Sequence, residues 1–527
     1  VQGYLKLAAQ GRYDEALALI KRENPLPAIC GRVCNRRCED ACTRGRVDAA
    51  VAIDEVKKFI AQRDLDAATR YVPPVVTPTR AGGFDQKIAI IGAGPAGLSC
   101  AFYLAEKGYK PVVFEKNERP GGMLTYGIPS FKLQKDVIEA EVEVIRLMGA
   151  EFRYGVEVGR DVTLDELRAQ GFKAFYVAIG CQGGRLAGIP GEDAEDVTVA
   201  VDFLRGVNSG KIDALPGCTI VVGGGNVAID VARNACRLGS EHVEMFCLES
   251  EAQMPASEEE RREAVEDGAH ISCGWGPKEI HLDEAGRVCG ITFKRCTRVF
   301  DDEGRFAPEY DENDLRRVDA DRVVMSIGQS IVWGDLLAGS KVELGRGQGA
   351  LADPQTYQTA EPDIFVGGDV YTGPSFAIDA IAAGHEAAVS IHRFVQPGST
   401  LTIGRNQRRY TALDRDDAVI ESYDNASREV AHVDREREKA APFSEYVETF
   451  TEEQVRAETA RCLGCGVSIV DPNKCIGCGL CTTKCAFDAI HLDRDRPECS
   501  TMVKYEQKLP SLGKYALKRA IKIKFGH

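Results

Sequence analysis

The chain carries near its end a run of cysteines whose spacing suits an iron–sulfur cluster. Its members follow the pattern C-x2-C-x2-C-x3-C and are Cys475, Cys478, Cys481 and Cys485. A tight loop of this spacing can wrap a [4Fe–4S] cubane with thiolates, and Gly477 and Gly479 let backbone amides approach the sulfides. A zinc ribbon or a chance arrangement is the alternative. Because such a cluster does one-electron chemistry, we interpret the other sites as electron donors or acceptors for it.

Further cysteines flank this run and occur near the start of the chain. Cys462 and Cys465 precede the run and Cys499 follows it. Two-cluster ferredoxins give the fourth cysteine of each motif to the other cluster. One assignment therefore joins Cys499 to the first three cysteines of the run, and Cys485 to Cys462 and Cys465. That second site lacks a ligand, so one cluster with zinc, or no metal, at Cys462 and Cys465 is equally compatible. A separate N-terminal group consists of Cys30, Cys34, Cys38 and Cys42.

A glycine-rich turn predicts a first dinucleotide site. The apolar strand 87–91 runs into Gly92-Ala93-Gly94-Pro95-Ala96-Gly97 and then a helix. In this G-x-G-x-x-G pattern Gly92 makes the turn, Gly94 admits a pyrophosphate and Gly97 lets helix pack on strand. The next strand ends at Glu115, whose carboxylate can bind ribose hydroxyls. The phosphates would meet the positive end of the helix dipole.

An acidic residue far along the chain identifies this first site as one for FAD. The strand 364–366 leads into Gly367-Gly368-Asp369, and two-domain flavoproteins use such an aspartate to hold the ribityl and phosphate end of the flavin. Gly121-Gly122-Met123 lies where the chain must pass close to the flavin. The predicted FAD contacts are Gly92, Gly94, Pro95, Ala96, Gly97, Glu115, Lys116, Gly122, Met123, Gly368 and Asp369.

A second turn, G-x-G-x-x-A, predicts a nicotinamide nucleotide site. The strand 219–222 leads into Gly223-Gly224-Gly225-Asn226-Val227-Ala228, and the next strand ends near Glu249. A carboxylate there hydrogen-bonds the 2′-hydroxyl of NAD but repels the 2′-phosphate of NADP. A surface acid beside Glu251 is the alternative interpretation. The predicted contacts are Gly223, Gly225, Asn226, Val227, Ala228 and Glu249, and further cofactor contacts are expected at Gly180 and Gly328.

These motifs predict a multidomain α/β protein, as expected for 527 residues. We expect a helical N-terminal iron–sulfur domain, two nested Rossmann-like domains for FAD and NAD, and a small α+β ferredoxin-like C-terminal domain. The tail is expected to be a solvated helix or a docking arm for an acidic partner. The expected boundaries are 1–65 helical, 66–86 linker, 87–200 FAD, 201–330 NAD(H), 331–398 FAD, 399–455 linker, 456–500 ferredoxin-type and 501–527 basic tail.

Composition narrows the setting in which this chemistry occurs. A net charge of −14 argues against nucleic acid as a main partner. Because no apolar run reaches the ~18 residues that span a bilayer, a membrane is not expected either. We interpret the 19 cysteines as cluster ligands and buried thiols rather than disulfides. We therefore expect the protein in a reducing, oxygen-poor cytoplasm. Since Val1 stands in what reads as the middle of a helical domain, we expect residues upstream of it.

The nested arrangement resembles the small subunit of glutamate synthase and its relatives, including the flavin half of dihydropyrimidine dehydrogenase. The resemblance covers about residues 1–395. It rests on Cys30-Gly31-Arg32-Val33-Cys34, Cys38-Glu39-Asp40-Ala41-Cys42, Tyr126-Gly127-Ile128-Pro129, Ala178-Ile179-Gly180, Met254-Pro255-Ala256 and Gly367-Gly368-Asp369. It implies FAD, a pyridine nucleotide and two N-terminal [4Fe–4S] clusters. By the same resemblance, Cys30, Cys34 and Cys38 serve one cluster with an upstream ligand, and Cys42 serves the other with three. The four could instead close one site themselves.

Two departures from the family bear on function. NADP-using members carry Tyr-Arg-Arg at the end of the second site's strand, whereas this chain has Cys247, Leu248 and Glu249, which favours NAD(H). The cysteine run near the end is not part of the short family members.

The favoured hypothesis is an NAD(H)-dependent FAD and iron–sulfur subunit of a larger redox complex. Iron–sulfur sites at both ends suggest two electron exits, and electron bifurcation with ferredoxin is part of the hypothesis. A glutamate synthase small subunit and a non-catalytic electron-conducting scaffold are the alternatives. No catalytic side chain is named, because hydride transfer belongs to the cofactors.

Overall fold

The computed structural model describes residues 1–75, 83–396, 398–405, 420, 423–465, 475–485, 490–493 and 504–525. Two compact units divide the chain after Cys465, and each is described by itself. Among the described residues, the sheets all lie in the first unit, and the second contains two helices.

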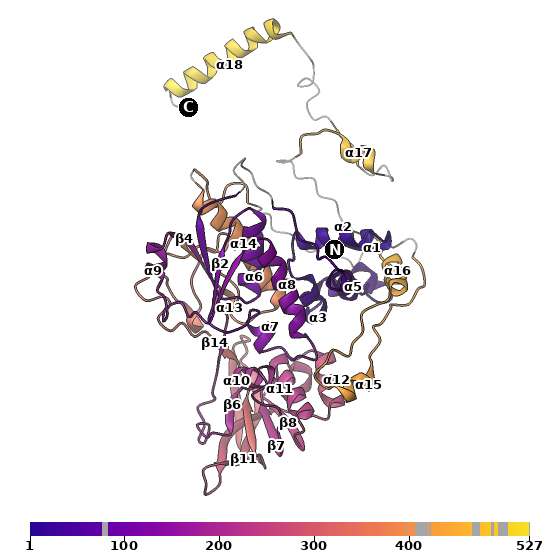
Figure 1. The fold of residues 1–527 in the computed structure, drawn as a ribbon, viewed down its shortest axis with the longest axis vertical. Coiled ribbons are helices and arrows are strands. Elements are labelled where there is room, and N and C mark those ends of the chain that lie inside the picture. Colours follow the sequence, from indigo (N-terminus) through magenta and orange to yellow (C-terminus); the bar gives the residue numbers. More distant parts are fainter. Residues whose placement is uncertain are drawn as a thin grey trace. The chain divides into compact units, whose positions relative to one another are not determined.

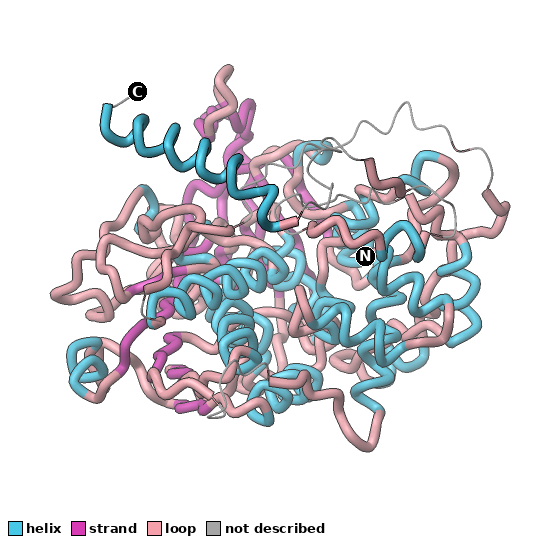
Figure 2. The backbone as a smooth tube through the Cα atoms, turned by 90° about the horizontal axis from the view of Figure 1, so that it is seen from above, coloured by secondary structure: helices cyan, strands magenta, loops and turns pink. Residues whose placement is uncertain are grey.

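The chain begins as a helical domain. Its elements are α1 (Gln2–Ala9), α2 (Tyr13–Lys21), α3 (Pro27–Val33), α4 (Arg37–Asp40), a 3-10 turn η1 (Thr43–Arg46) and α5 (Ile53–Asp66). Leu17, Ile20 and Val56 form part of a core of its own. Helix α3 instead buries Ala28 and Ile29 in the core of the domain that follows. These helices lie to one side of the strands (Figures 1 and 2).

The first sheet is parallel, with strand order β15-β4-β1-β2-β3. Its strands are β1 (Lys87–Ile91), β2 (Val112–Glu115), β3 (Glu151–Tyr154), β4 (Phe172–Val177) and β15 (Ile364–Val366). The helices of this domain are α6 (Pro95–Glu106), α7 (Met123–Tyr126), α8 (Lys135–Leu147), α9 (Leu164–Ala169), α13 (Asp369–Thr372) and α14 (Ala377–Val395). Helix α6 packs along α14, so the two FAD-directed segments of the sequence share one core.

The second sheet is also parallel, in the order β6-β13-β7-β8-β9. Its strands are β6 (Val197–Val199), β7 (Cys218–Val222), β8 (His242–Cys247), β9 (His270–Cys273) and β13 (Arg322–Met325). Its helices are α10 (Ala200–Asn208), α11 (Asn226–Arg237) and α12 (Glu258–Glu266), with the 3-10 turn η2 (Glu251–Gln253). Because β6 pairs with β13, this sheet starts slightly before the expected boundary at 201.

Smaller sheets complete the first unit. An antiparallel sheet consists of β10 (Trp275–Leu282), β11 (Val288–Phe300) and β12 (Phe306–Val318). Strands β5 (Gly183–Gly184) and β14 (Gln329–Ser330) pair where the chain passes between the two Rossmann-like domains. The 3-10 turn η3 (Arg346–Gln348) lies in the second stretch of the FAD domain, after the second Rossmann-like domain.

Much of the segment expected as a linker over 399–455 is folded onto the neighbouring domains. Helix α15 (Arg435–Ala440) forms ion pairs with the second Rossmann-like domain, and α16 (Glu452–Ala460), which begins in this segment, packs against the helical domain. Phe450 and Val455 are buried in the same core as Leu17 and Val56. The stretch reads as charged and irregular because only a few apolar side chains, widely spaced, make these contacts.

The second unit contains α17 (Leu480–Lys484) within the cysteine run and α18 (Tyr505–Phe525) in the basic tail. Leu512, Tyr515 and Ile523 on α18 are exposed within this unit. Among the helices that the structure describes, none combines the length and apolarity needed to cross a bilayer.

Candidate functional site

A single cavity of about 2020 Å³ joins the two dinucleotide loops. Gly92 and Gly94 line it from the first sheet, and Gly223 and Gly225 line it from the second. Both loops follow the carboxyl ends of parallel strands, where open α/β sheets bind their ligands. Cys34 of the helical domain lines the same cavity, so the three predicted kinds of redox site meet in one place.

The first loop has the backbone shape that a pyrophosphate requires. Gly92 has φ +105°, and a Cβ there would lie 2.5 Å from the Ala178 carbonyl oxygen. A Cβ on Gly97 would overlap the Gly92 carbonyl oxygen, whereas Gly94 faces open space. Helix α6 starts at Pro95, directly after the loop. The loop therefore leaves room for phosphates at the start of a helix, which fits FAD.

Glu115 has a role that its motif does not reveal. The side chain is buried, and its Oε2 accepts a hydrogen bond from the Ala93 amide at 2.8 Å. Oε1 accepts from the Asn117 amide at 2.9 Å. The Asn117 side-chain amide also donates to Oε1, at 2.6 Å. The carboxylate thus fastens the loop between β1 and α6, and one lone pair of Oε2 stays available to a ribose.

Asp369 approaches the same loop from the other end of the domain. It starts α13, and its Oδ1 accepts from the Ser375 amide at 3.2 Å. Burial raises the pKa of Asp369 to about 6. Ala96 lies close by, since a Cβ on Gly368 would stand 3.0 Å from the Ala96 Cβ. The further predicted contacts that line the cavity are Lys116, Gly122, Met123, Gly180 and Gly328.

The second loop repeats this geometry in the second sheet. Gly223 has φ +143°, its Cβ position is filled by the Ser326 carbonyl, and Gly225 faces open space. Ala228 is fully buried against the sheet. Asn226 and Val227 line the cavity, and the Asn226 Oδ1 accepts from the Ser257 amide at 3.2 Å.

Glu249 follows β8 and lines the cavity beside this loop. Its Oε2 lies 3.0 Å from the Cβ position of Gly224. The carboxylate is therefore held against the turn that would bind the adenosine half of a nucleotide. A nucleotide bound to this loop in the way that the sequence predicts would bring its 2′ position toward this carboxylate.

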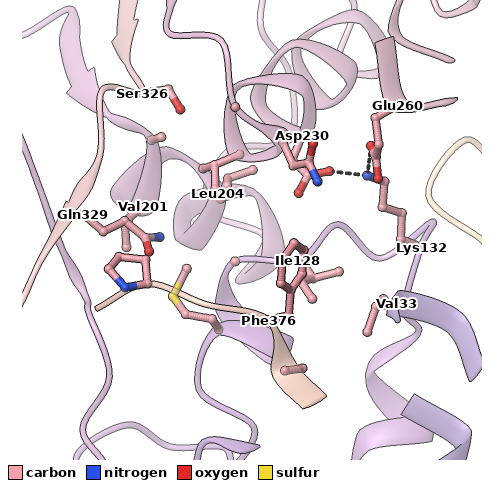
Figure 3. Close-up of a pocket in the computed structure, with 18 of the residues that line it drawn as sticks. Val33, Ile128, Lys132, Val201, Leu204, Asp230, Glu260, Ser326, Gln329 and Phe376 are labelled. Atoms are coloured by element: carbon pink, nitrogen blue, oxygen red, sulfur yellow. Dashed lines mark hydrogen bonds and ion pairs between the residues drawn. The ribbon is translucent and has the colours of Figure 1, made fainter. Parts of the chain in front are cut away.

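The labelled side chains that line the cavity between the two loops lie outside the two glycine-rich motifs (Figure 3). Its apolar part includes Ile128, Val201, Leu204 and Phe376, which suits a water-poor site for hydride transfer. Lys132 forms an ion pair with Asp230 at 2.7 Å and another with Glu260.

Burial by itself would lower the pKa of Lys132, but these two carboxylates more than offset it and raise that pKa. A buried ammonium paired in this way stays charged at the cavity wall. Only tertiary proximity could identify this group, because its members lie on three separate segments.

The N-terminal cysteines contact two different hydrophobic cores, and Cys34 lies close enough to Cys30 and Cys38 to interact electrostatically with both thiols. Cys34 lines the cavity and the Cys30 thiol donates to the Asn24 Oδ1 at 3.8 Å. Cys38 and Cys42 instead pack against the helical core, as does Cys462. The thiols, all free, provide the soft donors that an iron–sulfur cluster requires.

The cysteines of the second unit have a different setting. Cys475, Cys478 and Cys481 are exposed and Cys485 is partly buried. Cys499 lies outside the described residues. Throughout the described part of the chain, no three His, Cys, Asp or Glu side chains are gathered as for one metal ion. In a cubane each thiolate binds a different iron, so its ligands stand further apart than those of a single ion.

Comparison with protein families gives three matches along the chain. Residues 86–384 match the pyridine nucleotide-disulphide oxidoreductase family. Residues 1–69 match dihydropyrimidine dehydrogenase domain II with its 4Fe-4S cluster, and residues 468–491 match a 4Fe-4S binding domain. These matches confirm the expected fold class, with an iron–sulfur domain at the N-terminal end, Rossmann-like domains and a 4Fe-4S domain toward the C-terminal end.

Curated relatives cover most of the chain. The beta subunit of the NADP(+)-dependent formate dehydrogenase of Moorella thermoacetica is 34% identical over 88% of this chain and 69% of its own length. The small chain of the NADPH glutamate synthase of Escherichia coli K12 is 35% identical over 75% of this chain and 86% of its own. The PreT subunit of an NAD-dependent dihydropyrimidine dehydrogenase from Escherichia coli O157:H7 is 33% identical over 73% and 85%.

A solved structure of FprA from Mycobacterium tuberculosis shares the fold, with a TM-score of 0.51 at 19% identity over 59% of this chain and 84% of that one. Its likeness bears on fold alone. The chain belongs to the pyridine nucleotide-disulphide oxidoreductase family and, within it, to the NAD(P)H-linked flavin and iron–sulfur oxidoreductase subunits related to the glutamate synthase small chain.

Proposed function

We propose that this chain moves electrons between NAD(H), FAD and [4Fe–4S] clusters as one subunit of a larger redox complex. The observation that carries the proposal is the shared cavity, which both glycine loops and Cys34 line. When bound, FAD accepts an electron pair and releases single electrons to clusters. The chain would hold the two nucleotides by their phosphates. The apolar wall of the cavity would keep water away from the space between them.

The nucleotide that this proposal assigns is NAD(H) rather than NADP(H). Glu249 supports it, because its carboxylate lies beside the second loop and would repel a 2′-phosphate. Relatives are named for either nucleotide, so family membership leaves the choice open. The charge of Glu249 is the observation that favours NAD(H) in this proposal.

Partner subunits and the destination of the electrons complete the proposal. The relatives include subunits of formate dehydrogenase and dihydropyrimidine dehydrogenase, which supports a hetero-oligomeric complex. We propose the cytoplasm as its location on the cysteine content alone. Two iron–sulfur regions, at 1–69 and 468–491, support two electron exits. We extend the proposal to a bifurcating complex in which ferredoxin takes one of the two electrons.

The experiment is an anaerobic titration of the purified holoprotein with NADH and, separately, with NADPH. NADH is expected to bleach the flavin absorbance and reduce the clusters at far lower concentration than NADPH. Reduction by NADPH alone would contradict the assignment. If neither NADH nor NADPH binds, the alternative of an electron-conducting scaffold would be favoured instead.

A glutamate synthase small subunit is the second candidate, favoured by 35% identity to the Escherichia coli chain of that name. Native purification with mass spectrometry of the co-eluting proteins separates the two. A glutamine-using large subunit would establish the second candidate and exclude bifurcation. Partners with flavin and iron–sulfur motifs would support the first.

A further inference from the structure

The segment 423–465, which we name the returning segment, comes back from the end of the FAD domain onto the N-terminal helices. Helix α16 packs against α1, and Phe450 and Val455 enter the helical core. The segment therefore forms part of the helical domain rather than a free connection to the cysteine run.

A buried ionic network fixes the end of the returning segment. Arg461 pairs with Glu458 at 2.7 Å, and both side chains are fully buried. Arg461 also contacts Asp48 at 3.0 Å, and Arg44 donates to the Arg461 carbonyl at 3.2 Å. Because a broken buried pair is costly, the backbone just before Cys462 is held against the turn that follows Cys42.

This network brings two pairs of cysteines together from opposite ends of the sequence. Cys462 packs against the same core as Cys38 and Cys42. The Cys465 thiol lies 3.2 Å from the Thr43 hydroxyl, 422 positions earlier in the chain. Thr43 directly follows Cys42, so Cys465 lies beside the helical domain and not only beside the terminal run.

We propose that Cys38, Cys42, Cys462 and Cys465 form one [4Fe–4S] site shared between the helical domain and the returning segment. Cys462 and Cys465 have the C-x2-C spacing of ligands to one cubane. Cys38 and Cys42 are assigned to the same site because they pack against the same core as Cys462. Four thiolates complete the site, and it needs none from the terminal run. The terminal run then keeps its own cysteines, Cys475, Cys478, Cys481 and Cys485, for a separate site.

This assignment replaces two expectations from the sequence: that Cys462 and Cys465 join Cys485, hold zinc or bind no metal, and that the resemblance places Cys38 and Cys42 on different clusters. It also means that the cluster of the helical domain takes two of its ligands, Cys462 and Cys465, from a segment far from that domain in the sequence. The returning segment would then be required for that cluster. The inference concerns ligands only, so it does not depend on which nucleotide or partner the proposed function names.

The test is anaerobic purification of the full chain and its Cys462→Ser/Cys465→Ser variant, followed by iron and sulfide analysis. Electron paramagnetic resonance (EPR) spectra of the dithionite-reduced proteins identify which cluster changes. The variant is expected to lose one cubane's iron and sulfide and one EPR signal. Flavin content and the signal removed by Cys475→Ser/Cys478→Ser should persist. Cys218→Ser/Cys289→Ser, at two partly buried cysteines of the nucleotide domain, is the matched control.

Three results would overturn the proposal: unchanged iron, loss of zinc in place of iron, or loss of the terminal run's signal. If the double variant also loses its flavin, the single variants Cys42→Ser and Cys465→Ser decide. Each should alter the same EPR signal, and changes in two different signals would refute a shared site. Iron content requires no NADH, so this outcome is separate from failure of the proposed function.

Discussion

Replacing Glu249 by glutamine tests nucleotide choice most directly, because it removes one charge and keeps the side-chain volume. In the wild type the carboxylate lies against the second glycine loop. Its hydrogen bond to a ribose hydroxyl is of the charged type, worth about 1.5–3 kcal/mol. Its repulsion of a 2′-phosphate at the rim of the cavity is on the order of 1–3 kcal/mol, between the values for water and for a protein surface.

The two effects act in opposite directions on the two nucleotides. Glu249→Gln should lower kcat/KM for NADH by roughly tenfold or more and raise that for NADPH, so their ratio shifts by about a hundredfold. The assay is steady-state reduction of a one-electron acceptor with each nucleotide. Glu251→Gln, at an exposed acid nearby, is the matched control and should leave the ratio unchanged. A shift in the Glu249 variant of less than about threefold would refute the electrostatic argument.

Three further predictions concern the scaffold of the site. Gly97→Ala should abolish FAD binding, because its Cβ would overlap a loop carbonyl; bound flavin per chain measures this. Arg461→Ala should weaken docking of the returning segment by about 3–5 kcal/mol, since it leaves Glu458 buried and unpaired. Hydrogen exchange of α16 should detect that loss, and Arg456→Ala, whose ion pair is exposed, should cost less than about 1 kcal/mol. Because burial raises the pKa of Asp369 to about 6, its ionisation should destabilise the flavin-free protein. Relative to Asp369→Asn, stability should fall by roughly 3 kcal/mol from about pH 4 to pH 6 and then level off. Urea unfolding across that range would show a flat difference if the argument is wrong.

The sequence by itself determined the parts of this protein that depend on local geometry. Each dinucleotide loop is one strand, one turn and one helix in succession, so the glycine pattern from Gly92 to Gly97 is sufficient to predict its shape. The cysteine spacing from Cys475 to Cys485 is similarly local, because it lies within one short stretch of chain, and it is sufficient to predict an iron–sulfur site.

Only the tertiary structure decided how distant segments meet. The sequence shows that Glu115 ends a strand, but not that its carboxylate also holds the Ala93 amide. It shows a C-x2-C pair at Cys462, but not that Cys465 returns to Thr43 from 422 positions away. Neither contact corresponds to a characteristic residue spacing in the sequence. Both arise from packing and buried charge between segments that are not adjacent in the chain.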